Sequence, residues 1–469
     1  MGRMDELAQL LGPQYVLTGA DADAYTVDWR GRYSGRALAV ARPGSVQELA
    51  DVVKWCAANR VPMVPQGGNT GLCGGATPDA SGSALVIATG RLNRIRHIDT
   101  DNDTMVVEAG CILQAVQQAA RDADRLFPLS LAAEGSCTVG GNLATNAGGT
   151  QVLRYGNARE LVLGLEVVTP QGEIWNGLRG LRKDNTGYDL RNLYIGSEGT
   201  LGFITAATLK LYPMPVAQCT ALLALESIDA AVSVLAAARK GFGAALTGFE
   251  LIAANCLEGV NRCFPEQRLP FEGESARLPW FALLELSDSE SEAHARERFE
   301  HVVGACVELG LVKDAVIAEN VAQSRALWHL RESIPLAEKA FGKSVKHDIS
   351  VPASRMADFV ATTNAALQAR FPGVEHVIFG HLGDGNLHYN VAKGTAYDEA
   401  ELLALQADIH GLVHDRVHAY DGSISAEHGV GQLKREYLPR YKDAVELALM
   451  RRIKAALDPD GLMNPGKVL

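Results

Sequence analysis

Residues 134–149 read EGSCTVGGNLATNAGG, a run of sixteen residues with almost no bulky side chains. A segment of this composition cannot build a hydrophobic core, so something else must fill the space beside it. A planar ligand meets that need, because the small hydroxyl and amide side chains can bond its phosphates and ring edges. The segment therefore predicts a binding site for a large cofactor.

A second glycine-rich loop lies earlier in the chain, where residues 65–71 read PQGGNTG directly after an apolar run. Such a loop turns backbone N–H groups toward an anion, while its glycines let a phosphate approach closely. It matches neither the Walker pattern nor the dinucleotide fingerprint. We interpret it as a candidate pyrophosphate cradle.

The surrounding pattern is typical of an α+β protein. A helix is expected to start at Ser45, with Glu48 three residues later in the form of a capping box, and to run to Asn59. Two prolines, Pro213 and Pro215, then interrupt the pattern, and Ala- and Leu-rich helices alternate with strands after them. Strands are expected at residues 37–40, 61–65, 84–88, 162–169, 193–195, 203–212 and 281–286.

Charge and hydropathy exclude two classes of function. The chain of 469 residues carries 44 basic and 55 acidic residues, a net charge of -11, and contains no Lys/Arg run, which argues against a nucleic-acid surface. No apolar run approaches the roughly 20 residues that cross a bilayer. Because the N-terminus also lacks the features of a signal peptide, we expect a cytoplasmic protein, with loose association to a membrane electron-transfer chain left open.

The eight cysteines are far apart and form no C-x-x-C pair. Reduced, mostly buried thiols are therefore expected. The spacing also excludes the usual iron–sulfur cluster motifs.

A hairpin is expected in the C-terminal half, where residues 374–391 read VEHVIFGHLGDGNLHYNV. If the strands pair about the Gly/Asp/Asn turn, His381 and His388 lie nearly opposite one another, with Cβ atoms about 5 Å apart. Asn390 would share the face of His388, because side chains alternate along a strand.

Residues 423–431, SISAEHGVG, place Glu427 next to His428, and Gly429 permits a backbone in which both face one site. A single histidine is more often a hydrogen-bonded residue than a ligand, but two His and one Glu form a plausible open site for zinc or manganese. Three further histidines, at 410, 414 and 418, are four residues apart, as on one face of a helix. They have no carboxylate in register, and we interpret them as a solvated helix face.

Both glycine-rich segments, together with YIGSEGTLG at 194–202 and NPGK at 464–467, resemble the FAD-binding domain of the vanillyl-alcohol-oxidase superfamily. The resemblance implies a two-subdomain FAD-binding domain of the PCMH type, an α+β substrate (cap) domain and a C-terminal segment that returns to the flavin. The corresponding expectations are an N-terminal helical segment at 1–36, the FAD-binding domain at 37–213, the cap domain at 214–420 and the returning segment at 421–469.

The same resemblance implies that FAD is held without a covalent bond, because Asn69 stands where covalently flavinylated relatives carry a histidine. Cys137, near the position of a second tether in some relatives, is expected to be an inert packed residue. The implied FAD contacts are Pro65, Gly67, Gly68, Asn69, Thr70, Gly71, Glu134, Gly135, Ser136, Thr138, Gly141, Asn142, Thr145, Asn146, Gly148, Gly199, Ile204 and Asn464.

The C-terminal motifs resemble the D-lactate and D-2-hydroxyglutarate dehydrogenase branch of that superfamily. The resemblance implies that His381, His388 and Glu427 hold the metal, with zinc preferred over manganese. His428 would face the substrate and accept its hydroxyl proton. Substrate contacts are further expected from Arg331, Lys346 and Asn390.

The expected activity is oxidation of a D-2-hydroxy acid to the 2-oxo acid, with a quinone or an electron-transfer flavoprotein as acceptor. Lys346 favours D-2-hydroxyglutarate, because a monocarboxylate such as D-lactate would leave a second cation beside Arg331 without a partner. Pro335 opposes this choice, since relatives that act on hydroxyglutarate carry a hydroxyl residue there. D-malate and D-lactate therefore stay open.

Two other functions stay open as well. The chain could be one subunit of a glycolate-oxidising complex, or a transferase similar to the alkyl-glycerone-phosphate synthases, which share the fold. The sequence does not decide whether the protein is a homo-oligomer.

Overall fold

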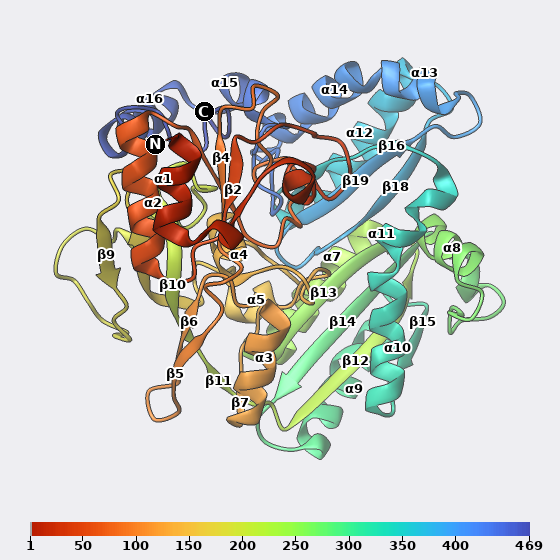
Figure 1. Ribbon diagram of the computed structural model, residues 1–469. Coiled ribbons are helices and arrows are strands. Elements are labelled where there is room, and N and C mark those ends of the chain that lie inside the picture. Colours follow the sequence, from red (N-terminus) through yellow and green to blue (C-terminus); the bar gives the residue numbers. More distant parts are fainter. Residues whose placement is uncertain (1) are drawn as a thin grey trace. The chain divides into compact units, whose positions relative to one another are not determined.

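The computed structural model describes residues 2–469 and groups them into two compact units (Figure 1). Unit 1 comprises the chain up to Gly149, Gly156–Met214 and Glu427–Leu469. Unit 2 comprises Thr150–Tyr155 and Pro215–Ala426. Helices and strands are mixed in both units, which confirms the expected α+β class.

The first part of unit 1 is a four-stranded sheet in the order β1-β2-β4-β3, in which β2, β4 and β3 run parallel. Helices α1 and α2 lie side by side (Figure 1), and the Trp55 indole donates a 2.9 Å hydrogen bond to Glu6. The elements are α1 (Arg3–Leu11), β1 (Val16–Leu17), β2 (Ala39–Ala41), α2 (Val46–Asn59), β3 (Met63–Gln66) and β4 (Leu85–Ala88).

Helix α2 begins where the sequence predicted, and its cap forms in part. The Ser45 hydroxyl accepts the Glu48 backbone N–H at 3.1 Å, as in a capping box. The Glu48 carboxylate, however, accepts the N–H of Gly44 rather than that of Ser45. The helix start is therefore satisfied by a variant of the expected motif.

The second part of unit 1 is a five-stranded antiparallel sheet in the order β5-β6-β10-β8-β9. The strand expected at 193–195 is wrong, because residues Arg191–Tyr194 form one turn of helix, α6. A three-residue apolar run does not distinguish a strand from a buried turn. The elements are β5 (Ile95–Asp99), β6 (Thr104–Glu108), α3 (Leu113–Asp122), β7 (Arg125–Leu126), α4 (Val139–Ala144), β8 (Val162–Val168), β9 (Ile174–Gly177), α6, β10 (Phe203–Lys210) and β11 (Tyr212–Pro213).

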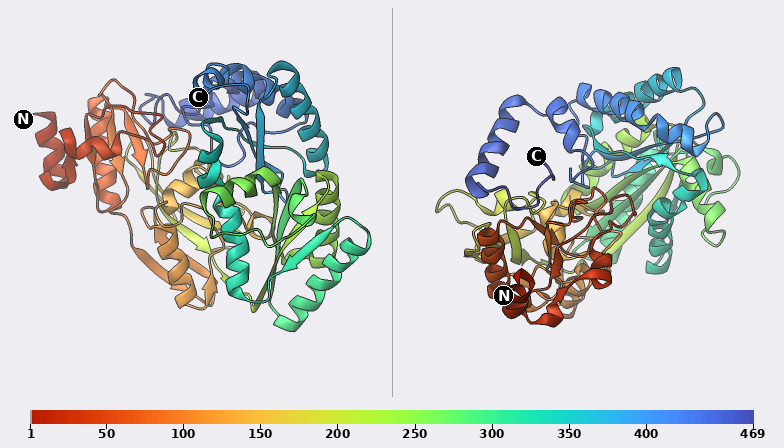
Figure 2. Two further views of the ribbon diagram at one scale, coloured as in Figure 1. Left: turned by 90° about the vertical axis from the view of Figure 1, so that its right-hand side faces the viewer. Right: turned by 45° about the horizontal axis from the view of Figure 1, so that its top comes forward.

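The C-terminal segment returns to the first sheet, as expected. Met463 forms a parallel bridge with Met63, and the Asn464 N–H donates to the Met63 carbonyl at 2.8 Å. The segment carries α15 (Leu438–Tyr441) and α16 (Ala444–Leu457), and α16 appears in dark blue in Figure 2. Lys454 ties α16 to the rest of unit 1 by donating to the Thr200 carbonyl at 2.7 Å.

Unit 2 is built on one sheet, in the order β15-β12-β14-β13-β18-β19-β16, with β17 also paired to β19. Its first four strands and the helices between them follow the split βαβ order of ferredoxin-like domains. The strands are β12 (Ala217–Leu225), β13 (Leu246–Ala253), β14 (Trp280–Asp288), β15 (Asp314–Ile317), β16 (Ser344–Val345), β17 (Asp348–Ser350), β18 (Glu375–Gly380) and β19 (Asn386–Ala392).

The helices of unit 2 pack along this sheet, with α7 against α9 and α12 against α14. Their apolar faces cover buried strand residues such as Phe249 and Leu284. The helices are α5 (Val152–Tyr155), α7 (Ile228–Phe242), α8 (Ala254–Cys263), α9 (Glu292–Glu308), α10 (Val321–Glu332), α11 (Ile334–Ala337), α12 (Met356–Arg370), α13 (Glu399–Ala404) and α14 (Gln406–Ala419).

Two further expectations concern features of the whole chain. All eight cysteines are free thiols, and six of them are buried. Among residues 2–469, none of the helices combines the length and the apolar character that a bilayer crossing requires.

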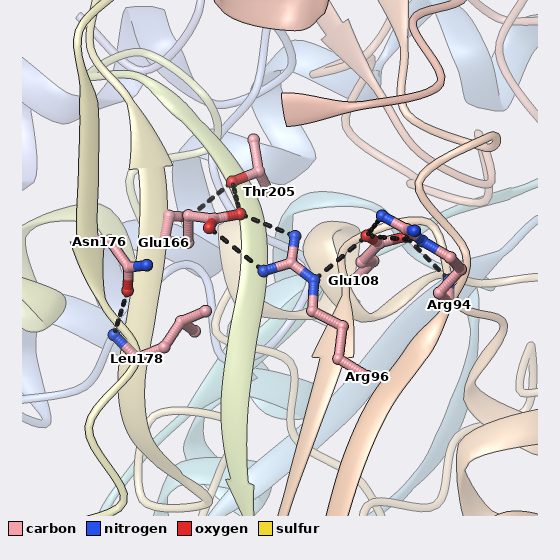
Figure 3. Close-up of polar contacts among 7 residues, drawn as sticks. All are labelled: Arg94, Arg96, Glu108, Glu166, Asn176, Leu178 and Thr205. Atoms are coloured by element: carbon pink, nitrogen blue, oxygen red, sulfur yellow. Dashed lines mark hydrogen bonds and ion pairs between the residues drawn. The ribbon is translucent and has the colours of Figure 1, made fainter. Parts of the chain in front are cut away.

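A charged network crosses the five-stranded sheet of unit 1 (Figure 3). Arg96 on β5 lies between two buried carboxylates, donating to Glu108 at 3.1 Å and to Glu166 at 2.9 Å. Arg94 also pairs with Glu108, and the Thr205 hydroxyl donates to Glu166 at 2.9 Å. Because carboxylates are rarely buried without a partner, these contacts hold four strands, β5, β6, β10 and β8, in one register.

We expect Arg96→Met to destabilise unit 1 by about 2–3 kcal/mol, since it leaves Glu166 buried beside a hydroxyl as its remaining donor. Arg94→Met is the control, because Arg94 is exposed and Glu108 keeps Arg96. Urea unfolding of the holoprotein measures both. Equal losses for the two variants would contradict the assigned role of Arg96.

Candidate active site

The two glycine-rich segments pack directly against each other in unit 1. A Cβ atom on Gly67 would lie 2.3 Å from the Thr138 hydroxyl oxygen, and one on Gly68 would lie 2.1 Å from the Ser136 carbonyl oxygen. Neither separation is sterically allowed, so both positions require glycine. At Gly68 the absence of a side chain therefore serves a close approach of two backbones, and at Gly67 it leaves room for the Thr138 side chain.

A pocket opens beside these segments, and residues of both segments line it. Among the residues expected to contact FAD, its lining contains Pro65, Gly67, Gly68, Asn69, Thr70, Gly71, Thr138, Gly141, Asn142, Thr145, Gly199 and Ile204. It also contains residues that the sequence did not single out for FAD, namely Gln66, Leu72, Cys73, Gly75, Ala76, Thr89, Cys137, Gly140, Ala144, Ser197, Glu198, Gly202, Phe203 and His428.

One buried polar atom in the lining is available to bond a ligand. The Thr138 hydroxyl oxygen is buried and has no hydrogen-bond partner among the described residues. A buried hydroxyl without a partner is destabilising, so a bound group that bonds it would be favoured. Together with the cavity and the close-packed glycine loops, this atom fits the binding of a large phosphate-bearing cofactor.

The remaining expected contacts lie outside the lining and serve the architecture around it. Glu134 accepts from Gln117 at 3.0 Å, and Asn146 accepts the Arg159 N–H at 3.0 Å. Asn464 is buried and donates to the carbonyls of Gly75 and Glu198, both at 2.9 Å. Three small residues are likewise absent from the lining, Gly135, Ser136 and Gly148.

Glu198 organises the segment that carries the expected base. Its carboxylate accepts the N–H groups of Val430 and Gly431 at 2.7 and 2.8 Å. Burial raises the pKa of Glu198 above its usual range, and the two N–H donors oppose that rise. Gly429 has φ +79, and a Cβ there would meet the Glu198 carboxylate at 2.8 Å, so only glycine fits the turn.

This turn determines the position of His428, which lines the cavity of unit 1. The His428 Nε2 atom lies 3.7 Å from the Glu427 carboxylate. Both side chains are about a quarter exposed, so each can reach a ligand. The expectation that Gly429 frees the backbone for both groups to face one side agrees with this geometry.

A second set of candidate residues lies in unit 2, around the carboxylate of Glu250 on β13. One Glu250 oxygen bonds His381 Nδ1 at 2.6 Å, and the other accepts Arg331 Nε at 2.7 Å. Burial raises the pKa of Glu250, but the charges of His381 and Arg331 outweigh burial and hold the pKa well below its usual range. No sequence motif marks Glu250, which reaches the site only through strand pairing.

The hairpin of His381 and His388 forms, but its register differs from the expected one. Phe379, not His381, lies opposite His388, because β18 ends at Gly380 and His381 already belongs to the turn. The two imidazoles still approach, with ring centroids 6.0 Å apart. The expected cross-strand placement is therefore wrong, while the expected proximity is correct.

Strand β17 adds a carboxylate that the sequence did not single out. Asp348 pairs with His388 across the β17–β19 ladder, and its carboxylate lies within 4.8 Å of a His388 ring nitrogen. Asp348 is buried and accepts a 3.0 Å hydrogen bond from Asn386. Unit 2 thus brings together two imidazoles and a carboxylate.

Lys346 has a carboxylate partner within the protein, the buried Glu338, which also accepts a 2.6 Å hydrogen bond from Asn390. The premise that a monocarboxylate substrate would leave Lys346 without a partner is therefore wrong. Pro335, taken as an argument against hydroxyglutarate, is an exposed residue in the first turn of α11, where a missing N–H is harmless.

Two family models match this chain. Residues 37–177 match the model of an FAD binding domain, and residues 214–468 match that of the C-terminal domain of FAD linked oxidases. The chain therefore contains an FAD-binding domain of the expected kind.

Curated relatives are similar over nearly the whole chain. A D-2-hydroxyglutarate dehydrogenase of Xanthomonas citri pv. viticola is 43% identical over 96% of this chain and 93% of its own. One of Stutzerimonas stutzeri is 38% identical over 99% and 98%. The mitochondrial D-2-hydroxyglutarate dehydrogenase of Bos taurus is 37% identical over 99% and 83%.

Solved structures show the same fold at low identity. p-Cresol methylhydroxylase with substrate bound superimposes with a TM-score of 0.76 at 17% identity, covering 99% of this chain and 96% of that one. An alkyldihydroxyacetonephosphate synthase gives a TM-score of 0.73 at 17% identity, covering 99% and 84%. From its domains and its relatives, the chain belongs to the FAD-linked oxidase family, in the branch whose curated members are named D-2-hydroxyglutarate dehydrogenase.

Proposed function

We propose that this protein is an FAD-dependent dehydrogenase that oxidises D-2-hydroxyglutarate to the 2-oxo acid. The observation that carries the proposal is His428, a basic side chain in the lining of the cofactor cavity. The names of relatives at 37–43% identity over nearly the whole chain support the substrate. Bound FAD would supply the acceptor for the two electrons of the substrate C–H bond.

We propose that FAD is bound without a covalent link. The Asn69 side chain donates a 2.8 Å hydrogen bond to the Val27 carbonyl, and an amide offers no ring nitrogen for a histidyl bond. Cys137 is buried, burial raises the pKa of its thiol, and the Asn142 amide lies 3.5 Å from its sulfur. A thiol in this state is a poor nucleophile.

His428 is the proposed base. A neutral imidazole can accept the hydroxyl proton as the bond to hydrogen at C2 breaks. Arg331 would bind a substrate carboxylate, since a guanidinium has five N–H donors in a planar fork and the bond to Glu250 engages one of them. Lys346 stays the proposed contact for the distal carboxylate and Asn390 a proposed substrate contact, with Glu338 positioning both.

We further propose that His381, His388 and Glu427 hold a divalent metal, zinc first and manganese second. The Glu250–His381 pair supports this assignment, because a metal-bound imidazole typically donates its other ring N–H to a carboxylate. A metal at this site would lower the pKa of the substrate hydroxyl. The backbone N–H of Ala426 donates a hydrogen bond to the Asp348 carbonyl at 3.3 Å. Glu427 is the residue that follows Ala426 in the chain.

The electron acceptor stays the one expected from the resemblance, a quinone or an electron-transfer flavoprotein. The cytoplasmic location likewise stays a prediction. D-malate, D-lactate, a glycolate-oxidase-like subunit and an alkyl-glycerone-phosphate-synthase-like transferase are the alternatives. Anaerobic bleaching of the flavin by a D-2-hydroxy acid separates the proposal from the transferase. Turnover of the isolated chain with an artificial dye separates it from the glycolate-oxidase-like subunit.

Among D-2-hydroxy acids, we expect D-2-hydroxyglutarate to show the highest kcat/KM. The paired change Lys346→Met with Glu338→Gln removes both charges and should lower kcat/KM for dicarboxylates by about 10–100-fold, the equivalent of one charged hydrogen bond, with little effect on D-lactate. Lys343→Met, at an exposed lysine nearby, is the control. An unchanged substrate ranking would remove Lys346 from recognition, and a preference for D-lactate would overturn the substrate.

His428→Asn should slow flavin reduction by about 10²–10⁴-fold, the usual effect of losing a positioned proton acceptor. Stopped-flow absorbance under anaerobic conditions measures the rate, and elemental analysis measures the metal. We expect the metal content to stay near that of the wild type. A parallel loss of metal would make His428 a ligand instead of the base.

Chelation should remove the metal and abolish turnover while FAD stays bound. Acid precipitation should then release FAD into the supernatant.

Glu250→Gln should weaken zinc binding by about 10–100-fold, since Glu250 orients His381. Glu285→Gln is the matched control, a buried carboxylate on β14 that bonds Trp328 and two threonines. Full activity of a metal-free preparation, or of His381→Ala with His388→Ala, would refute the metal proposal.

A further inference from the structure

Three histidines of unit 2, distinct from the proposed active-site ligands, meet in the interior. His410 and His414 lie one turn apart on α14, and His347 lies between β16 and β17. All three are at most 8% exposed. The expected solvated helix face is therefore wrong for His410 and His414, because α14 turns these residues inward and leaves His418 exposed.

The three imidazoles converge on one point. Each offers a ring nitrogen, and these nitrogens all lie within 4.8 Å of one another. The His347 Nε2 and His410 Nδ1 atoms are 2.9 Å apart. The His414 ring centroid lies 5.5 Å from that of His410 and 5.6 Å from that of His347. Three polar rings are thus buried in mutual contact, with their nitrogens close enough to reach one ion.

The orientation of His347 is that of a metal ligand. Its Nδ1 bonds the Tyr389 carbonyl at 2.8 Å, and a carbonyl can only accept, so Nδ1 carries the proton. In the neutral ring Nε2 then carries a lone pair, and this lone pair points at His410. A carbonyl that fixes the tautomer of an imidazole in this way is a regular partner of histidine ligands.

The backbone around His347 is equally fixed. Its N–H donates to the Asn390 side chain at 3.2 Å, and its carbonyl accepts the Tyr389 N–H at 3.0 Å. His347 is thus anchored to β19 at three points, once through its ring and twice through its backbone. On the other side, the i, i+4 spacing of His410 and His414 presents both rings on one face of α14.

We propose that His347, His410 and His414 form a second metal site, which holds a divalent ion of the zinc type. Imidazole nitrogens suit such ions, and three of them with a water as fourth ligand complete a tetrahedral shell. Bonds of 2.0–2.1 Å would place the nitrogens about 3.3 Å apart, so His347 and His410 separate by a few tenths of an ångström. The ion replaces the proton that they share.

The role assigned to this site is structural. The ion joins α14 to the short strands β16 and β17, of which β17 carries Asp348, the register partner of His388. It would thereby hold the edge of the sheet next to the proposed active site. Because its ligands differ from His381, His388 and Glu427, the two sites can be tested separately.

The test uses the FAD-loaded chain in the His381→Ala His388→Ala background, stripped with a chelator and then titrated with Zn²⁺. We expect one equivalent of zinc per chain to stay bound after gel filtration and to raise the melting temperature. Adding His414→Gln should weaken binding by more than the roughly 10–100-fold that loss of an outer partner costs. His418→Gln, on the same helix, should leave binding unchanged.

A background protein that binds no zinc, or binds it equally with His414→Gln, would overturn the proposal and leave a hydrogen-bonded histidine cluster. If the double variant loses FAD, the comparison moves to the wild-type chain. There His414→Gln should lower the metal content by one equivalent, and His418→Gln should not. Wild-type metal that is lost with His381 and His388 but is insensitive to His414 would support the active-site metal alone.

Discussion

The arrangement of unit 2 depends on one buried carboxylate. Glu250 is 1% exposed, and a carboxylate so far from water is stable only when cations and donors surround it. Both of its oxygens are engaged, one by His381 and one by Arg331. A residue of the strand core thereby fixes the orientation of a proposed metal ligand and of a proposed substrate cation at once. The Phe379 ring, 4.9 Å from the guanidinium carbon, packs against the same Arg331.

In unit 1 the carboxylate of Glu198 likewise orients its neighbours. Its carboxylate has backbone N–H groups as partners, so it orients a turn of the chain rather than side chains. That turn carries His428 into the cavity lining, and Asn464 bonds the Glu198 carbonyl from the returning C-terminus. The cofactor cavity therefore depends on three segments that are far apart in the sequence. Their meeting point is one residue, Glu198.

The His347 cluster shows how the same sheet can hold a second centre. His347 and Asp348 are neighbours in the chain, and alternation along the strand sends their side chains to opposite sides. Asp348 faces the hairpin of His388, whereas His347 faces α14. A structural ion on one side of β17 would thus limit the movement of a carboxylate on the other. The two sites would be linked through one short strand.

The sequence by itself determined the local features of this protein. Glycine clusters, the capped start of α2, the hairpin turn and the adjacent Glu427 and His428 are read from neighbouring residues, because turn and helix-cap chemistry is local. Three features were decided only by the tertiary structure. They are the register that pairs Phe379 with His388, the inward orientation of His410 and His414, and the carboxylates that bond the site residues, namely Glu250, Glu198 and Glu338. Glu250 and Glu338 stand in no motif, because their partners arrive from distant strands and helices, and their stability comes from the charges of those partners rather than from their neighbours in the chain. Glu198 lies inside a motif, but its partners Val430 and Gly431 are more than 200 positions away in the chain.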